Sequence, residues 1–345
     1  MHIFSLKNIF TGLLILFFPV LLLGQENIFS HYFSANTFYN PAMVGDTRFL
    51  QMQMEERLQP TVSGIPVNNL LLSVDYKIQN QHSGIGVHIN QRNSVFSETE
   101  IKTNYSHTLL LLRKIWIKGG LGISLNTVNT NANTFKFPDQ YDRFGYTGNP
   151  TQEPSLSEKA IYAGLSSGLA VYYEQGWFSI ALNNINRPLV QFAGNEYRTP
   201  LLFLTDLGYL FPIDKRKKSK RMFSRNGGFE PYSSLGPVAQ FYKNGKFQII
   251  SFGINAFTRP IFWGIQYRYN SVNQKLFSEG VASLNLMAGY RNEILSVGYS
   301  YDFMLNHTPT NYKGAHEISL IYYFYAIKED YKKYKLFPYP NQLMY

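Results

Sequence analysis

SGIGVHINQR, residues 83–92, alternates apolar residues with polar residues or glycine from Gly84 to Asn90. Successive side chains of an extended chain leave on opposite faces, so Ile85, Val87 and Ile89 share one face and the polar residues share the other. This period of two predicts a β-strand with one face suited to lipid and one suited to water.

Thirteen further segments show a comparable pattern, and most of them end in Tyr, Phe or Trp. Most are as long as the roughly 9–11 residues that a tilted strand needs to cross a bilayer. The fourteen predicted strands are 47–57, 68–76, 83–92, 99–112, 115–126, 160–173, 177–184, 201–211, 232–242, 247–256, 261–269, 279–291, 294–302 and 316–325.

Apolar residues are plentiful but dispersed in this chain, which is 45% hydrophobic and 16% aromatic. A soluble β-sandwich would also disperse them, and alternation alone does not show which face points inward. The apolar leader, the length and the aromatic strand ends together favour the membrane, because aromatic residues form girdles at both membrane interfaces. We therefore predict an all-β fold, a transmembrane antiparallel outer-membrane β-barrel of about 14 strands.

An apolar leader precedes the strands. Residues 9–23 (IFTGLLILFFPVLLL) follow a short segment with the single charge Lys7. The run is shorter than the roughly 20 residues of a membrane-spanning helix, and Pro19 interrupts it. We therefore predict a signal peptide over residues 1–24, which places the mature chain in the envelope of a Gram-negative cell.

The remaining chain divides into three predicted parts: an N-terminal periplasmic segment (25–46), the barrel (47–325) and a C-terminal tail (326–345). An even strand number puts both ends of the barrel on the periplasmic side. The connections agree in most places, because predicted periplasmic turns such as Arg113-Lys114 are short and predicted outward connections such as 127–159 are long.

The outward connection 127–159 includes the aromatic residues Tyr141, Phe144 and Tyr146. Loops of this length in compact folds are usually functional, so these three residues are candidate partner contacts. The alternative is a plug or rim loop that folds into the lumen.

The formal net charge is +10, and much of the excess lies in one run on the predicted periplasmic side. A solvated loop explains such a run, and so does a contact for acidic lipid headgroups or an acidic partner domain. Nucleic acid is not expected as a partner behind a secretory leader. The candidate contacts are Lys215, Arg216, Lys217, Lys218, Lys220 and Arg221.

No catalytic, metal-binding or cofactor-binding pattern emerges. His82, His88, His107, His307 and His316 lack a neighbouring Ser and acid at a recognisable spacing, and we interpret them as lumen-facing polar residues. Gly119, Gly120 and Gly122 lie within a strand rather than between a strand and a helix, so they do not form a phosphate loop; they are expected to allow close packing across the barrel wall. An enzyme is not predicted, and no cofactor is expected.

Several motifs along the chain resemble the PorP/SprF family of type IX secretion system membrane proteins. The opening QENIFSHYFSANTFYNPAMVGDTR matches in Gln25, Phe29, Ser30, Tyr32, Phe33, Asn40, Pro41, Ala42 and Gly45. NNINRP (183–188), GYSYDF (298–303) and GAHEISLIYYF (314–324), with its paired His316 and Glu317, resemble later family segments. Each piece also has a structural interpretation: Asn40-Pro41-Ala42 shapes a turn, and His316 with Glu317 closes a hairpin against Asp302.

The resemblance implies a non-enzymatic outer-membrane barrel that works with the type IX apparatus. Such a protein helps to export or attach a large surface protein, such as a gliding-motility adhesin, by binding its C-terminal domain. The implied partners are outer-membrane lipid, that client domain and other type IX components in the periplasm. The alternative function is a channel or transporter for small hydrophobic solutes.

Overall fold

The computed structural model describes residues 28–46, 50–61, 65–78, 82–112, 115–130, 138–149, 159–192, 195–213, 233–258, 260–271, 280–292, 294–305 and 314–324. The predicted signal peptide (1–24), the basic run with its six candidate contacts and the predicted tail (326–345) lie outside these residues. No helix in the described part of the chain is long and apolar enough to cross a membrane.

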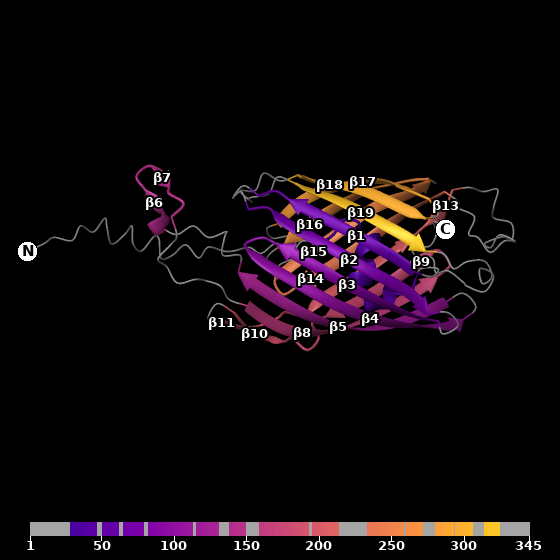
Figure 1. The fold of residues 1–345 in the computed structure, drawn as a ribbon. Coiled ribbons are helices and arrows are strands. Elements are labelled where there is room, and N and C mark those ends of the chain that lie inside the picture. The colour runs from indigo at the N-terminus through magenta and orange to yellow at the C-terminus, as the bar shows by residue number, and fades with distance from the viewer. Residues whose placement is uncertain are drawn as a thin grey trace, which may run out of the picture.

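Fourteen antiparallel strands form a closed barrel (Figure 1), which confirms the predicted fold and strand number. Barrel strands adjacent in the sequence pair with each other, and β1 pairs with β19 to close the ring. Each of the fourteen predicted segments overlaps one of these strands. They are β1 (Leu50–Gln59), β2 (Val67–Ile78), β3 (Ser83–Asn93), β4 (Phe96–Leu112), β5 (Ile115–Thr130), β8 (Lys159–Tyr173), β9 (Gly176–Asn183), β12 (Leu202–Tyr209), β14 (Ser234–Asn244), β15 (Phe247–Thr258), β16 (Ile261–Ser271), β17 (Gly280–Arg291), β18 (Leu295–Met304) and β19 (Ala315–Phe324).

Four small elements accompany the barrel in the described part of the chain. The two-residue strand β13 (Phe211–Pro212) pairs with the start of β14. Two hairpins stand in the longer connections: β6 (Tyr141–Asp142) with β7 (Gly145–Tyr146), and β10 (Leu189–Phe192) with β11 (Asn195–Arg198). A single helical turn, η3 (Pro138–Gln140), precedes β6.

The inner face of the wall is polar and the outer face is apolar. On β1, Glu55 and Arg57 are buried toward the lumen, while Met52 and Met54 are exposed on the outside. The same alternation continues around the ring, because a strand turns successive side chains to opposite faces. This arrangement is the reverse of a soluble protein and is that of a membrane barrel.

The two ends of the barrel differ. At one end β1 begins and β19 ends, and tight turns such as Glu174-Gln175 connect most of the strands; the long connection from β12 to β14 is the exception. We call this the short-turn end and the opposite one the long-loop end. Tyr173, Tyr290 and Tyr322 are exposed on the outer wall near the short-turn end, as expected for an aromatic girdle.

The lumen is filled by residues 28–46, which we call the lumenal segment. It contains α2 (Tyr32–Tyr39) and the 3-10 turn η1 (Pro41–Met43). Its contacts reach strands on opposite sides of the ring, from Glu317 on β19 to Asn183 on β9. This placement corrects the expected position of residues 25–46 in the periplasm, because the described part of that segment lies inside the barrel.

Local chemistry explains the shape of the lumenal segment. Asn40 is extended (φ −122°, ψ 109°), as the residue before a proline prefers, so α2 ends there. The Asn40 side chain accepts a hydrogen bond from the Ala42 N–H at 2.9 Å and starts η1. The Asn-Pro-Ala motif does shape a turn, but it lies within the lumen.

Glycines in the wall let the lumenal segment approach closely. A Cβ on Gly120 would lie 2.3 Å from the Ala42 nitrogen, and a Cβ on Gly84 would lie 2.5 Å from the Gly45 Cα. Gly45 itself has a φ of +74°, which side chains rarely adopt. The strand glycines therefore serve close packing, but against a backbone inside the barrel.

Candidate functional site

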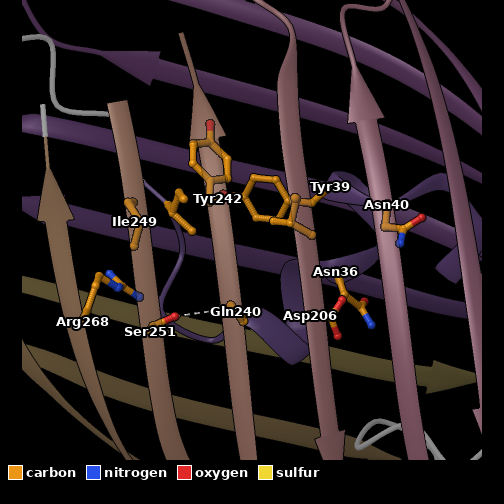
Figure 2. A pocket seen from close by; sticks show the side chains of 11 residues that line it. Asn36, Tyr39, Asn40, Asp206, Gln240, Tyr242, Ile249, Ser251 and Arg268 are labelled. Carbon is orange, nitrogen blue, oxygen red and sulfur yellow. Dashed lines mark hydrogen bonds between the residues drawn. The ribbon is translucent and has the colours of Figure 1, made fainter. Parts of the chain in front are cut away.

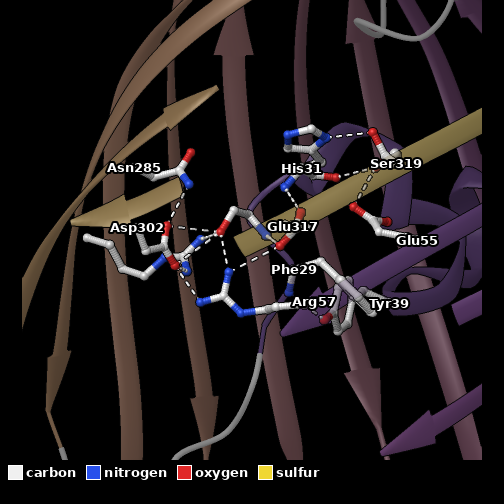
Figure 3. Close-up of polar contacts among 12 residues, drawn as sticks. Phe29, His31, Tyr39, Glu55, Arg57, Asn285, Asp302, Glu317 and Ser319 are labelled. Carbon is white, nitrogen blue, oxygen red and sulfur yellow. Dashed lines mark hydrogen bonds and ion pairs between the residues drawn. The ribbon is translucent and has the colours of Figure 1, made fainter. Parts of the chain in front are cut away.

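A buried group of charges joins the wall to the start of the lumenal segment (Figure 3). We call it the Arg57 cluster; its members are Arg57 on β1, Arg268 on β16, Asp302 on β18 and Glu317 on β19. Arg57 Nη1 lies 3.1 Å from Glu317 Oε2, and Arg57 also pairs with Asp302. Arg268 Nη1 lies 3.3 Å from Asp302 Oδ2. Two cations thus balance two carboxylates in a site closed to solvent.

The carboxylates of this cluster also hold the lumenal segment. Glu317 accepts hydrogen bonds from the Ser30 N–H at 2.7 Å and the His31 N–H at 2.6 Å. The Ser30 hydroxyl donates to Asp302 at 3.2 Å. A buried charge is tolerated only when it is paired and hydrogen-bonded. The lumenal segment supplies hydrogen-bond donors that the buried carboxylates need, and the carboxylates in turn hold the segment in place.

His31, Glu55 and Glu317 lie close enough together to be compared with a metal site. Most of their polar atoms have other partners: the His31 Nδ1 is 2.7 Å from the Ser319 hydroxyl, and Glu55 accepts from Ser34 at 2.8 Å. The His31 Nε2 has no hydrogen-bond partner among the described residues. Both oxygens of Glu317 bind the lumenal segment or Arg57. The arrangement fits a hydrogen-bonded anchor better than a metal centre.

A second anchor holds the lumenal segment at the short-turn end. Lys118 on β5 pairs with Asp46 and donates to the Val44 carbonyl. The Tyr172 hydroxyl donates to Asp46 at 2.6 Å. Asp75 on β2 accepts from the Gly45 N–H at 2.6 Å.

A third set of contacts holds the C-terminal turn of α2. Lys102 on β4 donates to the Phe38 carbonyl at 2.8 Å and to Asn183 Oδ1 at 2.5 Å. Asn183 in turn donates to the Tyr39 carbonyl at 3.0 Å. The last carbonyls of a helix have no partner within it and attract cations, so Lys102 and Asn183 stabilise this end.

Two cavities flank the lumenal segment. The smaller, of about 20 Å³, lies between α2 and strands β12, β14 and β15, and Figure 2 shows its lining. The larger, of about 180 Å³, opens at the long-loop end, and we call it the vestibule. Phe38 and Tyr39 line its base, and Val128 lies on its wall where Val190 of β10 packs.

The structure describes three of the nine candidate residues. Tyr141, Phe144 and Tyr146 lie on the β6–β7 hairpin, with exposed fractions of 50%, 83% and 48%. We call it the aromatic hairpin; it stands clear of the barrel at the long-loop end (Figure 1). The described part of the 127–159 connection therefore does not plug the lumen. The six basic candidates lie outside the described residues.

Two interpretations of histidines need correction. His88 faces the lumen, but His107 and His316 point to the outer wall, because their strand registers place them on that face. His316 is 2.8 Å from the Tyr299 hydroxyl, whereas its neighbour Glu317 joins Asp302 through Arg57 inside the barrel.

Solved structures with a similar barrel include CdiB from Acinetobacter baumannii, the P. putida toluene transporter TodX and a Pseudomonas aeruginosa FadL homologue. Their TM-scores are all 0.44, at 7%, 9% and 10% sequence identity. The matches cover 80%, 85% and 85% of this chain; it spans 60% of CdiB and 94% of each of the other two chains. No curated protein matches the sequence.

The decisive comparison is with protein families. The model of the type IX secretion system membrane protein PorP/SprF matches residues 22–322, which include the lumenal segment and nearly the whole barrel. That family is one of secretion-system membrane proteins and is not an enzyme class. The chain is an outer-membrane β-barrel and belongs to the PorP/SprF family.

Proposed function

We propose that this barrel helps to export or attach a large, adhesin-like surface protein by binding the C-terminal domain of that client. One observation supports a holding role most directly: the lumen is filled by residues 28–46, which three sets of buried polar contacts lock in place. A filled lumen leaves the ends of the barrel as the surfaces that can bind a partner. Membership of a type IX secretion family supports a secreted protein as the client.

We place the long-loop end at the cell exterior, because barrels of this kind have short periplasmic turns and longer outward loops. The aromatic hairpin then faces the client. Tyr141, Phe144 and Tyr146 offer rigid apolar area at low entropic cost, which favours protein contacts. Other type IX components would meet the short-turn end, where β12 ends and β14 begins and where the chain between them holds the basic run.

The alternative is a channel or transporter for small hydrophobic solutes. Passage through the lumen would require displacement of the lumenal segment, together with its ion pairs Arg57–Glu317 and Lys118–Asp46. Breaking such buried pairs is costly, so the holding role is the simpler function.

Deletion of the gene tests the proposal. One or a few large surface proteins should disappear from the cell exterior, while other type IX cargo still leaves the cell, and the purified C-terminal domain of the missing protein should bind the purified barrel. Re-expression of the wild-type chain is the control. Loss of all type IX secretion would indicate a core subunit, and an unchanged surface proteome would refute the secretion role.

A further inference from the structure

We propose that the vestibule receives an uncharged, extended polypeptide segment, and, resting on the proposed function, that the client supplies it. The aromatic hairpin would bind folded surface of the client, while the vestibule would bind one strand-like stretch of its chain. Four properties of the vestibule favour this class of ligand: its volume, the unpartnered acceptors of its lining residues, the pairing of its charges and the burial of its aromatic rings.

The shape of the vestibule restricts what can enter. It measures about 180 Å³ and ends at Phe38 and Tyr39 of α2. The carbonyls of both residues accept hydrogen bonds from Lys102 and Asn183, so neither carbonyl is free to bind a ligand. A folded domain of 100 residues has a radius of gyration of about 13 Å, so only an extended segment fits.

Three of the residues that line this cavity carry buried acceptor atoms without a hydrogen-bond partner among the described residues. They are Asn90 Oδ1 on β3, Asn244 Oδ1 at the end of β14 and Thr199 Oγ1 just before β12. Because a buried acceptor without a partner costs about 1–3 kcal/mol, three of them in one cavity favour a ligand with several donors. The backbone N–H groups of an extended peptide supply donors at regular intervals.

The charges around the vestibule are already paired within the protein. Arg92 pairs with Glu98, and Lys102 donates to the Phe38 carbonyl and to Asn183. Glu100 is hydrogen-bonded to Ser124 and faces Lys102. A charged ligand group would therefore lose water without gaining an opposite charge, so an uncharged segment rich in Gly, Ser, Thr or Asn is favoured.

The aromatic residues decide between a peptide and a sugar. Sugar rings bind by stacking on an open aromatic face. Of the four aromatic residues that line the vestibule, Phe38, Tyr39 and Tyr242 are buried in the apolar cluster between the lumenal segment and the wall, and Tyr162 is half-buried. The faces of the three buried rings are covered, whereas the amide and hydroxyl oxygens of Asn90, Asn244 and Thr199 lack partners in the described part of the chain, and this combination fits a peptide backbone.

The test measures binding of synthetic probes to the purified full chain in detergent. The probes are a short peptide of Gly, Ser, Thr and Asn with blocked ends, the same peptide with Lys or Asp inserted, and a neutral oligosaccharide. We expect saturable binding of the uncharged peptide only. Asn90→Leu and Asn244→Leu should each weaken it about fivefold, which corresponds to one hydrogen bond of about 1 kcal/mol.

Asn270→Leu is the matched control, because Asn270 on β16 faces the lumen near the long-loop end but does not line the vestibule. It should bind the peptide as the wild type does. Absence of saturable peptide binding, equal binding by all variants, or preference for the oligosaccharide would each overturn the inference. The client domain is assayed in parallel: if it binds the wild type and Asn90→Leu equally, the vestibule inference fails while the proposed function stands. If no client domain binds, the proposed function fails, and the peptide assay still decides whether the vestibule is a peptide site.

Discussion

Arg57 and Glu317 stand directly opposite each other across β1 and β19, the pair that closes the barrel, and Arg57 Nη1 lies 3.1 Å from Glu317 Oε2. The same Glu317 carboxylate accepts the N–H groups of Ser30 and His31 in the lumenal segment. One ion pair therefore links closure of the ring to occupation of the lumen. We expect the two to be coupled, so that damage to this pair loosens both.

The first prediction concerns stability. Arg57→Met leaves Asp302 and Glu317 buried with less compensating charge and should destabilise the folded barrel by about 3–5 kcal/mol. The measurement is the temperature at which the fast-migrating folded band is lost on a gel. Arg92→Met is the control; it breaks the half-exposed pair with Glu98 and should cost about 1 kcal/mol or less. Equal melting of the two variants would contradict the coupling.

The second prediction concerns the lumen. The wild-type barrel should give little steady conductance in planar bilayers. Gly120→Leu should displace the lumenal segment, because even a Cβ there would lie 2.3 Å from the Ala42 nitrogen, and should raise conductance. Gly119→Leu is the adjacent control, since Gly119 faces outward and a Cβ there would meet no atom within 4 Å. Large currents in the wild type would instead favour the transporter.

The third prediction concerns the aromatic hairpin. Replacing Tyr141, Phe144 and Tyr146 with Ser should weaken binding of the client domain and leave the melting of the barrel unchanged, because these side chains are exposed. Pull-down with the purified client domain measures the loss. Tyr173→Ser removes an equally exposed aromatic at the opposite end and should bind normally. Undiminished binding by the triple variant would exclude the hairpin as the contact.

The fourth prediction concerns the basic run, whose six candidate residues are Lys215, Arg216, Lys217, Lys218, Lys220 and Arg221. Exchanging its six candidate residues for Gln should leave barrel assembly intact but reduce co-purification with periplasmic partners. The difference should be largest at low salt, since salt screens exposed charges over about 10 Å at 0.1 M. Gln replacements of Lys159, Lys243 and Lys246, at the long-loop end, form the control. Cleavage of the run by protease added to whole cells would place it outside and reverse the orientation.

The sequence by itself determined the fourteen strands, their approximate limits and the difference between short and long connections. These features are local: alternation over ten residues defines a strand, and polar or glycine-rich breaks define its ends. SGIGVHINQR, for example, predicts a strand over 83–92, and the structure has one over Ser83–Asn93. The motifs of the PorP/SprF family likewise belong to the sequence alone.

Tertiary structure alone decided which face of each strand points inward and what fills the lumen. The alternation of apolar and polar residues is the same whichever face of the strand points inward. It therefore does not show whether Glu55 or Met54 is the inner residue, and only the closed barrel decides this. Glu317 meets Ser30 across 287 residues of chain, and no local pattern encodes such a contact. Gly120 indicated close packing in the sequence, but the backbone that it admits, in residues 28–46, is identified only in the closed barrel.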